Sequence, residues 1–247
     1  AAIAAGKHVI TANKALLAKH GNEIFAAALE KGVMVAFEAA VAGGIPIIKA
    51  LREGFVANRF VAIYGIVNGT CNYILTRMKL EGADFADVLT DAQKLGYAET
   101  PPDLDIDGHD AQHKIGILAS LAHGFWVDHH KIHTEGIRDV SKIDMLFAQQ
   151  LGYTIKLLGI VKPAAGRGAQ GHGKLPAGVQ VSVYPTLIPN AHVLASVNGV
   201  FNACFVRGDV VGDTLFYGRG AGKDATASAV LSDVADAALD LKGGGKV

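Results

Sequence analysis

The stretch YTIKLLGIVK, residues 153–162, is where the pattern of the sequence changes. Before it, apolar runs alternate with amphipathic segments. From it onward, GVQVSVYPTLI at 178–188 and NACFVRG at 202–208 follow as strand after strand. Interleaved helices and strands favour an α/β fold, whereas successive strands favour neighbours in one sheet. The sequence therefore predicts an α/β chain that leads into a mixed sheet.

The part before residue 150 is predicted to interleave strands and helices. Three apolar runs are expected to be buried strands: residues 8–12, 33–41 and 60–67. Helices are predicted where a capping residue marks an end. One is closed by Gly32, a short one begins near Pro46, one lies at 71–81, one runs from Asp84 to Gly96, and a last one covers 226–241.

Composition narrows the class of function. The chain has 247 residues, enough for one large or two modest domains at about 100 to 200 residues each. Lys and Arg number 23 and so do Asp and Glu, so no net charge attracts nucleic acid or an anionic membrane. No apolar run approaches the roughly 20 residues of a membrane-spanning helix, and no secretory signal pattern opens the sequence. We expect a cytoplasmic protein that acts on a small molecule, with Cys71 and Cys204 as reduced thiols.

The segment DIDGHDAQHKIGILASLAHG, residues 105–124, combines many ionisable groups with an apolar continuation. Apolar residues surround the later turns, which predicts a helix that is buried on most sides. Asp110 and Lys114 share a face at i and i+4. They form either an exposed ion pair worth a few tenths of a kcal/mol or a functional pair in a partly desolvated site. Glu99, in a loop stiffened by Pro101 and Pro102, is a candidate for the same cleft.

The same helix also suggests a metal site. His109 and His113 lie at i and i+4 with a carboxylate beside the first, as in some zinc-dependent hydrolases. That pattern would need a third histidine where Ala119 stands and glutamate where Asp110 stands. A zinc-dependent hydrolase that uses His109 and His113 is therefore kept as the alternative function.

Two glycine-rich segments resemble nucleotide-binding loops. GRGAQG at 166–171 fits the dinucleotide fingerprint, but Pro163 precedes it and no helical pattern follows, which favours a hairpin loop. GRGAGKD at 218–224 lacks two residues of a Walker loop. It nevertheless enters a helix, so its free N–H groups are either available to a phosphate or used in tight packing.

Five segments together resemble homoserine dehydrogenase, in that family's order and spacing. They are GKHVITANKALLA (6–18), FEAAVAGGIPII (37–48), GIVNGTCNYIL (65–75), AQKLGYAETPPDLDIDGHDAQHKIGILASLA (92–122) and YGRGAGKDATASAV (217–230). The resemblance implies an NADP- or NAD-dependent oxidoreductase that interconverts L-homoserine and L-aspartate 4-semialdehyde, on the branch to threonine, methionine and isoleucine. It also implies a homodimer.

The resemblance assigns roles to particular residues. Lys114 is expected to give a proton to the aldehyde oxygen, and Asp110 and Glu99 to hold the substrate, with Gly96 lining its site. Lys14, in TANK, is expected to contact both cofactor and substrate. The cofactor is also expected to contact Gly220 or Gly222. A sodium ion is expected to be bound by the backbone carbonyl groups of Glu38, Val41, Gly43 and Ile45.

The domain organisation follows from the same resemblance. Residues 1–37 and 207–247 are expected to be the remnant of a Rossmann-type nucleotide-binding domain. They flank a catalytic and dimer-forming α+β domain, residues 38–206, with the mixed sheet. The family's amino-terminal glycine-rich strand and turn, its main pyrophosphate site, has no counterpart in these 247 residues. We therefore expect this chain alone to be weak or inactive.

Overall fold

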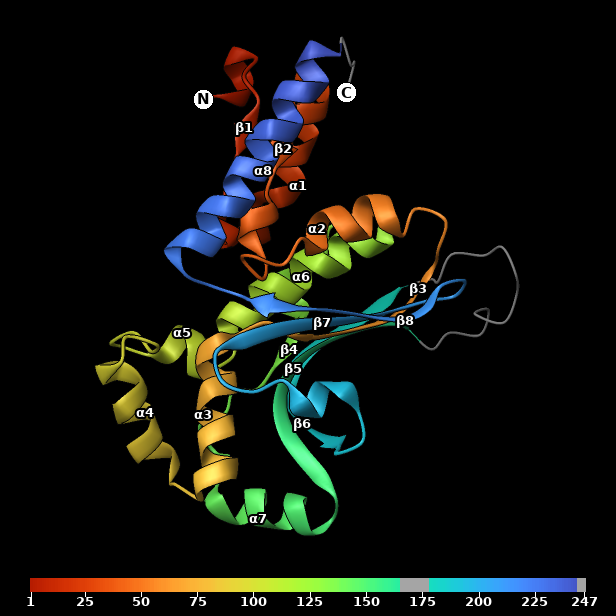
Figure 1. Ribbon diagram of the computed structural model, residues 1–247. Helices are drawn as coiled ribbons and strands as arrows, with labels where there is room; N and C mark the ends of the chain where they lie inside the picture. The colour runs from red at the N-terminus through yellow and green to blue at the C-terminus, as the bar shows by residue number, and fades with distance from the viewer. Residues whose placement is uncertain (165–177, 244–247) are drawn as a thin grey trace.

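A six-stranded mixed sheet is the centre of the molecule (Figure 1). The computed structural model describes residues 1–164 and 178–243. The strand order is β4-β6-β5-β3-β7-β8, in which β4 and β6 run parallel and the other neighbours are antiparallel. The strands are β3 (Phe60–Ile66), β4 (His133–Thr134), β5 (Tyr153–Pro163), β6 (Val179–Pro189), β7 (Phe201–Gly208) and β8 (Gly212–Arg219).

Side chains alternate between two hydrophobic cores, one on each face of this sheet. On β3, Ile63 belongs to the larger core and Ile66 to the smaller one. Helices cover the face with the larger core, and a 3-10 turn at Val193–Ser196 covers the other. The helices of this part are α2 (Ile47–Lys49, continued by a π-helical turn at Ala50–Gly54), α3 (Gly69–Glu81), α4 (Phe85–Lys94), α5 (Asp103–Ile106), α6 (His109–His123) and α7 (Lys142–Gln150).

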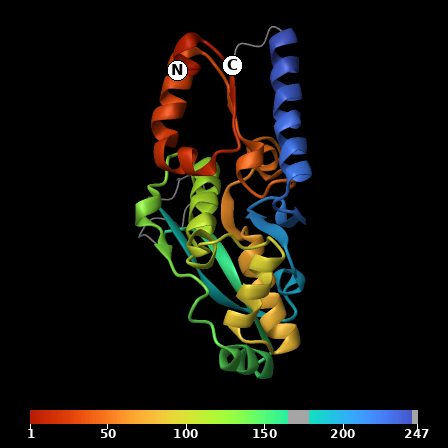
Figure 2. The ribbon, with the colours of Figure 1, turned by 90° about the vertical axis from the view of Figure 1, so that its left-hand side faces the viewer.

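A smaller unit is built from the two ends of the chain. Strand β1 (Val9–Ile10) pairs in parallel with β2 (Val35–Ala36), and α1 (Lys14–Lys31) connects them. A parallel pair needs such a crossover, which makes this a β-α-β unit. The last helix, α8 (Lys223–Lys242), contacts β1, and α1 and α8 flank the small sheet on opposite sides (Figure 2).

The α/β class and the mixed sheet are confirmed, whereas one predicted strand is much shorter than expected and one strand was not predicted. The strand expected at 33–41 is limited to Val35–Ala36 and gives way to a 3-10 turn at Glu38–Ala40. That turn carries the Glu38 carboxylate to the start of α2, where it accepts hydrogen bonds from the N–H groups of Ile48 and Lys49, both at 2.8 Å. These hydrogen bonds of the Glu38 carboxylate take the place of further strand pairing after Ala36.

The strand that was not predicted is β8, Gly212–Arg219. The expected domain boundary at 207 falls inside β7, and β8 extends the large sheet to Arg219 through a tight turn at Gly212. None of the β8 residues is fully buried. An edge strand of this kind lacks the apolar run by which the other strands were predicted. The GRGAQG segment lies outside the described residues, and no described helix is long and apolar enough to cross a membrane.

Candidate active site

Helix α6 is held close to the sheet by a pair of glycines. Gly65 of β3 and Gly159 of β5 face each other in the ladder, and Ile115 of α6 lies against both. A Cβ atom at Gly159 would lie 2.8 Å from Cγ1 of Ile115, closer than packed carbon atoms approach. Because Gly65 and Gly159 have no side chain, α6 can lie close to the sheet, and this short distance fixes the position of the first two turns of α6.

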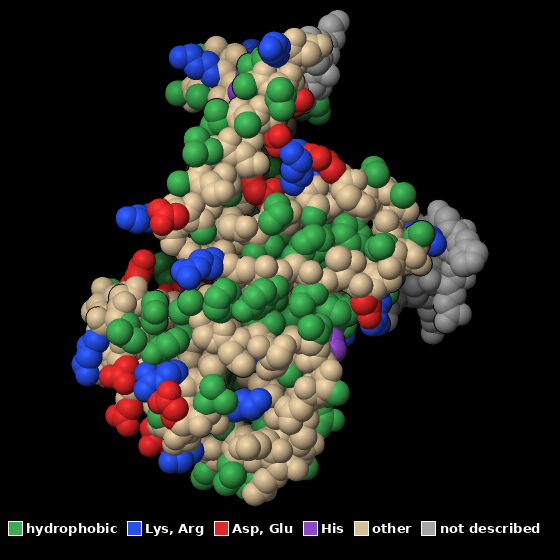
Figure 3. All heavy atoms as spheres, in the orientation of Figure 1, with side chains coloured by type: hydrophobic (Ala, Val, Ile, Leu, Met, Phe, Trp, Pro, Cys, Tyr) green, Lys and Arg blue, Asp and Glu red, His purple; other side chains and the backbone are tan. Residues whose placement is uncertain are grey.

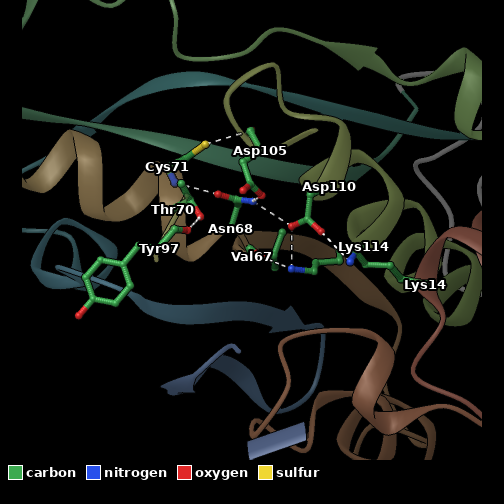
Figure 4. Close-up of polar contacts among 9 residues, drawn as sticks. All are labelled: Lys14, Val67, Asn68, Thr70, Cys71, Tyr97, Asp105, Asp110 and Lys114. Atoms are coloured by element: carbon green, nitrogen blue, oxygen red, sulfur yellow. Dashed lines mark hydrogen bonds and ion pairs between the residues drawn. The ribbon is translucent and has the colours of Figure 1, made fainter. Parts of the chain in front are cut away.

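Asp110 and Lys114 form a pair in those turns. Asp110 is 8% exposed, and its Oδ2 atom lies 2.7 Å from Nζ of Lys114. Nζ of Lys114 also donates to the backbone oxygen of Val67, at 2.8 Å (Figure 4). With side chains only 12% and 10% exposed, the pair is partly desolvated, and so the reading of an exposed surface pair is wrong.

Lys14 reaches the same carboxylate from the small unit. It begins α1, directly after Asn13, whose side chain caps that helix by accepting from the N–H of Leu16. Nζ of Lys14 lies 3.2 Å from Oδ1 of Asp110, so each oxygen of this carboxylate faces one ammonium group (Figure 4). The structure thus brings together three residues that the sequence singled out.

Lys14 and Lys114 stabilise the ionised form of Asp110. Burial by itself would raise the pKa of Asp110, but the charges of Lys114 and Lys14 oppose this. Together with hydrogen bonds from Lys114 and Asn68, they keep the pKa of Asp110 below its ordinary value. The site therefore presents an ionised carboxylate to the space beside Lys114.

Sequence reasoning missed two polar residues of this cluster. The side chain of Asn68, 5% exposed, donates from Nδ2 to Oδ2 of Asp110 at 2.9 Å and to Oδ1 of Asp105 at 2.7 Å. Burial and the nearby charge of Asp110 raise the pKa of Asp105. Asn68 is the N-cap of α3, accepting from the N–H of Cys71. An asparagine before a predicted helix is the signal that could have drawn attention to it.

Glu99 and Gly96 lie apart from this cluster. Both are exposed. The backbone oxygen of Glu99 accepts from Nε2 of Gln93 at 3.3 Å. Among the described residues, no hydrogen bond or ion pair joins the Glu99 carboxylate to Asp110 or Lys114. Gly96 has a positive φ of 74° and closes the turn after α4. Their predicted roles stay predictions.

The glycine-rich turn before α8 packs against the segment expected to bind sodium. The N–H of Gly44 donates to the oxygen of Arg219 at 3.0 Å, and a Cβ atom at Gly43 would lie 2.6 Å from the oxygen of Gly220. Ala42 and Gly43 both have positive φ, 56° and 46°, which turns the chain sharply. The structure thus places the two predicted binding segments side by side.

The start of α8 suits a negatively charged group. Gly222 precedes the helix, and no side-chain cap is found there among the described residues. The first N–H groups of a helix have no partner within it, and they attract phosphate or carbonyl oxygens. Gly220 itself is buried against Asn202, whose amide fills the position of a Cβ atom. Tight packing explains Gly220, and a φ of 114° explains Gly222.

The described histidines do not form a metal site with other described ligands. His109 is exposed, and the ring of His113 faces that of His129 with centroids 5.5 Å apart. Burial lowers the pKa of both His113 and His129. In the part of the chain that the structure describes, no group of three or more His, Cys, Asp or Glu side chains could hold a metal ion. Nothing supports the zinc-dependent hydrolase.

Comparisons with known proteins point to one family. The family model for "Homoserine dehydrogenase" matches residues 46–235, and the model for "Homoserine dehydrogenase, NAD binding domain" matches residues 1–38. A homoserine dehydrogenase of Pseudomonas aeruginosa is 54% identical over 235 residues, which cover 95% of this chain and 52% of the relative. One from Bacillus subtilis is 46% identical over 233 residues, covering 94% and 51%.

Solved structures give the same picture. The crystal structure of a homoserine dehydrogenase from Thiobacillus denitrificans superposes with a TM-score of 0.92 at 53% identity, covering 98% of this chain and 53% of that one. A hyperthermophilic archaeal homoserine dehydrogenase in complex with NADPH gives 0.80 at 30% identity, covering 96% and 66%. The chain spans about half the length of the curated relatives it matches.

Proposed function

The chain belongs to the homoserine dehydrogenase family, and from this membership we propose that it carries the substrate side of an NAD(P)-dependent oxidoreductase. The reaction is the interconversion of L-homoserine and L-aspartate 4-semialdehyde. The observation that carries the proposal is the arrangement of Lys114 between Asp110 and Val67, with Lys14 on the second oxygen of Asp110.

Lys114 is the proton donor of the proposed reaction. An ammonium group has three N–H bonds, and two of those of Lys114 point to Asp110 and to the oxygen of Val67. The third is free to meet the aldehyde oxygen of the substrate. When hydride adds to the carbonyl carbon, negative charge develops on that oxygen, and Lys114 stabilises it and then transfers its proton. In the reverse direction, neutral Lys114 takes the proton from the hydroxyl group.

Asp110, Glu99, Gly96 and Lys14 are proposed to bind and orient the substrate. Asp110 orients Lys114 and offers its ionised carboxylate to the ammonium group of the substrate, with Glu99 and Gly96 as further substrate contacts. Lys14 stands where the small unit meets this site, which suits contact with both cofactor and substrate. A bound nicotinamide cofactor would supply or accept the hydride.

The cofactor, NADP or NAD, is assigned to the small unit. The β1-α1-β2 arrangement is the kind of unit that binds nucleotides, and the open start of α8 at Gly222 would donate N–H groups to the cofactor, with Gly220 packed beneath it. The boundary of this unit is proposed at 37 and near 220. Residues 38–219 then form the catalytic and dimer-forming domain.

A sodium ion is proposed at the turn after β2. Backbone carbonyls of Glu38, Val41, Gly43 and Ile45 would bind it, since hard cations prefer oxygen ligands. The positive φ of Gly43 and its contact with Gly220 support a closely turned backbone there. Melting temperatures in NaCl and in KCl at equal ionic strength test the site. A higher value in NaCl supports it, and equal values oppose it.

A homodimer in the cytoplasm is also proposed. Strand β8 is an edge of the sheet, and hydrophobic side chains gather in a band over β7 and β8 (Figure 3). Tyr217 is 53% exposed and stacks on Phe201. Exposed apolar groups on an edge strand favour association with another chain. Light scattering after size-exclusion chromatography measures the mass directly, and a monomer at all concentrations would contradict the proposal.

The proposed reaction is tested in a chimaera. This chain replaces the matching residues of the Pseudomonas aeruginosa homoserine dehydrogenase, so that the rest of a complete relative is present. L-homoserine-dependent reduction of NAD⁺ or NADP⁺ is the expected result, followed by absorbance of the reduced cofactor. A chimaera that is folded and binds cofactor but does not oxidise L-homoserine would refute the proposal.

A further inference from the structure

We propose that Asn68 is a positioning residue, which holds Asp105 and Asp110 side by side and thereby fixes Lys114 through Asp110. The inference rests on the proposed function of Lys114 as proton donor. Among the described residues, Asn68 makes hydrogen bonds to Asp105, Asp110 and Cys71 but none to Lys114. Its effect on the reaction is therefore indirect, through the carboxylate that pairs with Lys114 at 2.7 Å.

The hydrogen bonds of Asn68 use its whole amide group. An amide NH₂ has two hydrogens, and here one goes to Asp105 at 2.7 Å and the other to Asp110 at 2.9 Å. The amide oxygen accepts from the N–H of Cys71 at 2.8 Å. The reversed orientation would set an oxygen against two carboxylates and an NH₂ against an N–H donor. The orientation of the side chain is therefore fixed by its three partners (Figure 4).

The position of this amide also explains how two acidic groups coexist. Asp110 is almost fully buried and Asp105 is partly buried, and their like charges repel. Burial raises the pKa of Asp105, and the hydrogen bond from Asn68 opposes this rise; the hydrogen bond from Asn68 to Asp110 also helps to keep the pKa of Asp110 low. Without a shared donor, the carboxylates would separate or one would take up a proton. Either change would weaken the ion pair between Asp110 and Lys114 and allow Lys114 to move.

Asn68 has a second task, as the N-cap of α3, and the two tasks can be separated by substitution. Asn68→Asp keeps an oxygen that accepts from Cys71 but removes both donors. Asn68→Ser also keeps a good cap and is left with one hydroxyl donor for two carboxylates. A residue that only caps α3 would tolerate both changes, whereas a positioning residue would tolerate neither.

The first experiment measures kcat, KM and the pH dependence of kcat/KM in the chimaera. For Asn68→Asp and Asn68→Ser we expect kcat to fall by up to about 100-fold, the cost of misplacing a reacting group by about 1 Å. The acid limb of kcat/KM should move to higher pH as the carboxylates become easier to protonate. Ser141→Ala is the matched control, because it removes the cap of α7 and touches neither carboxylate. It should leave kcat and the acid limb unchanged.

A second experiment does not depend on turnover. Carboxyl groups are titrated by NMR in the parent protein and in Asn68→Ser, and we expect the pKa of Asp105 to be higher in the variant. An unchanged pKa of Asp105 would overturn the proposal, even in a chimaera without activity. Full kcat and an unmoved acid limb in an active Asn68→Asp chimaera would overturn it as well. A parent chimaera that is folded and binds cofactor but does not oxidise L-homoserine would instead refute the proposed function.

Discussion

At the scale of single residues, the site depends on how one buried carboxylate is shared. Asp110 receives Lys114 on one oxygen and Lys14 on the other, and Asn68 adds a hydrogen bond. The three donors come from three separate segments of the chain. Removing any one of them leaves a buried charge less well compensated, and such a loss costs more than the loss of an exposed pair.

Lys114→Ala tests the proton donor. In the chimaera, kcat should fall by about 10²- to 10⁴-fold, the usual contribution of a positioned acid or base. Steady-state assays with L-homoserine measure it. Lys131→Ala is the control, since Lys131 is a largely exposed lysine whose side chain is 83% accessible. If Lys114→Ala and Lys131→Ala had the same kcat as the parent, Lys114 would have no part in the reaction.

Lys156 predicts a pH dependence of stability. It is 1% exposed, it donates to Asn72 and to the oxygen of Val197, and burial together with Lys79 lowers its pKa to about 7. The unfolded chain keeps this proton up to about pH 10.4, so between about pH 7 and 10.4 the unfolded state binds more protons. The free energy of unfolding therefore gains up to about 1.4 kcal/mol per pH unit from this group as the pH rises.

Urea unfolding of the chain at several pH values measures this contribution. The parent should become more stable, relative to Lys156→Met, as the pH rises from about 7 to 10, whereas Lys131→Met should follow the parent. Parallel curves for the parent and Lys156→Met would mean that Lys156 titrates alike in the folded and unfolded states.

At the scale of elements, the contact between α6 and the sheet governs the site. Gly159→Ala would place a Cβ atom 2.8 Å from Cγ1 of Ile115, so α6 must move or the strand must distort. Overpacking of this kind costs about 1–3 kcal/mol. The urea midpoint should fall accordingly, whereas in Gly54→Ala the added Cβ atom meets no atom within 4 Å and the midpoint should hold or rise slightly. Equal urea midpoints for both variants would show that α6 can move away from residue 159 without lowering the free energy of unfolding.

The elements also show what a single sequence can and cannot predict. Helix α6 was predictable because apolar residues surround its later turns, and the ends of α1 at Gly32 and of α4 near Gly96 were marked by glycines. Strand β8 was missed because an edge strand without buried residues carries no apolar run. The pairing of Asp110 with Lys114 follows from helical spacing, but Lys14 is nearly 100 positions away, and only tertiary packing brings it to Asp110.

At the scale of the whole molecule, the small unit holds a single pair of strands, β1 and β2, and among the described residues it lacks a glycine-rich strand-to-helix turn. Such a turn holds the pyrophosphate of a dinucleotide with backbone donors. Losing two charge-assisted hydrogen bonds, at about 1.5 to 3 kcal/mol each, weakens binding by roughly two to four powers of ten. This chain alone should therefore bind NADPH poorly and turn over little.

Titration of the 247-residue chain with NADPH, followed by fluorescence or calorimetry, measures the affinity. The chimaera serves as the reference, because it contains the remaining length of a complete relative. Micromolar binding by the chain alone would contradict the prediction and would mean that the turn before α8 and Lys14 suffice.

The contact between α8 and the turn after β2 also affects how the protein is made. The N–H of Glu38 donates to Oδ2 of Asp233 at 2.9 Å, across 195 positions of sequence, and Nζ of Lys49 pairs with Asp236 at 2.7 Å. At about 5 to 20 residues per second, a ribosome needs roughly 10 to 40 seconds to translate that interval. The central sheet can form before Asp233 and Asp236 are synthesised, so the contacts of Glu38 and Lys49 with α8 form after the central sheet.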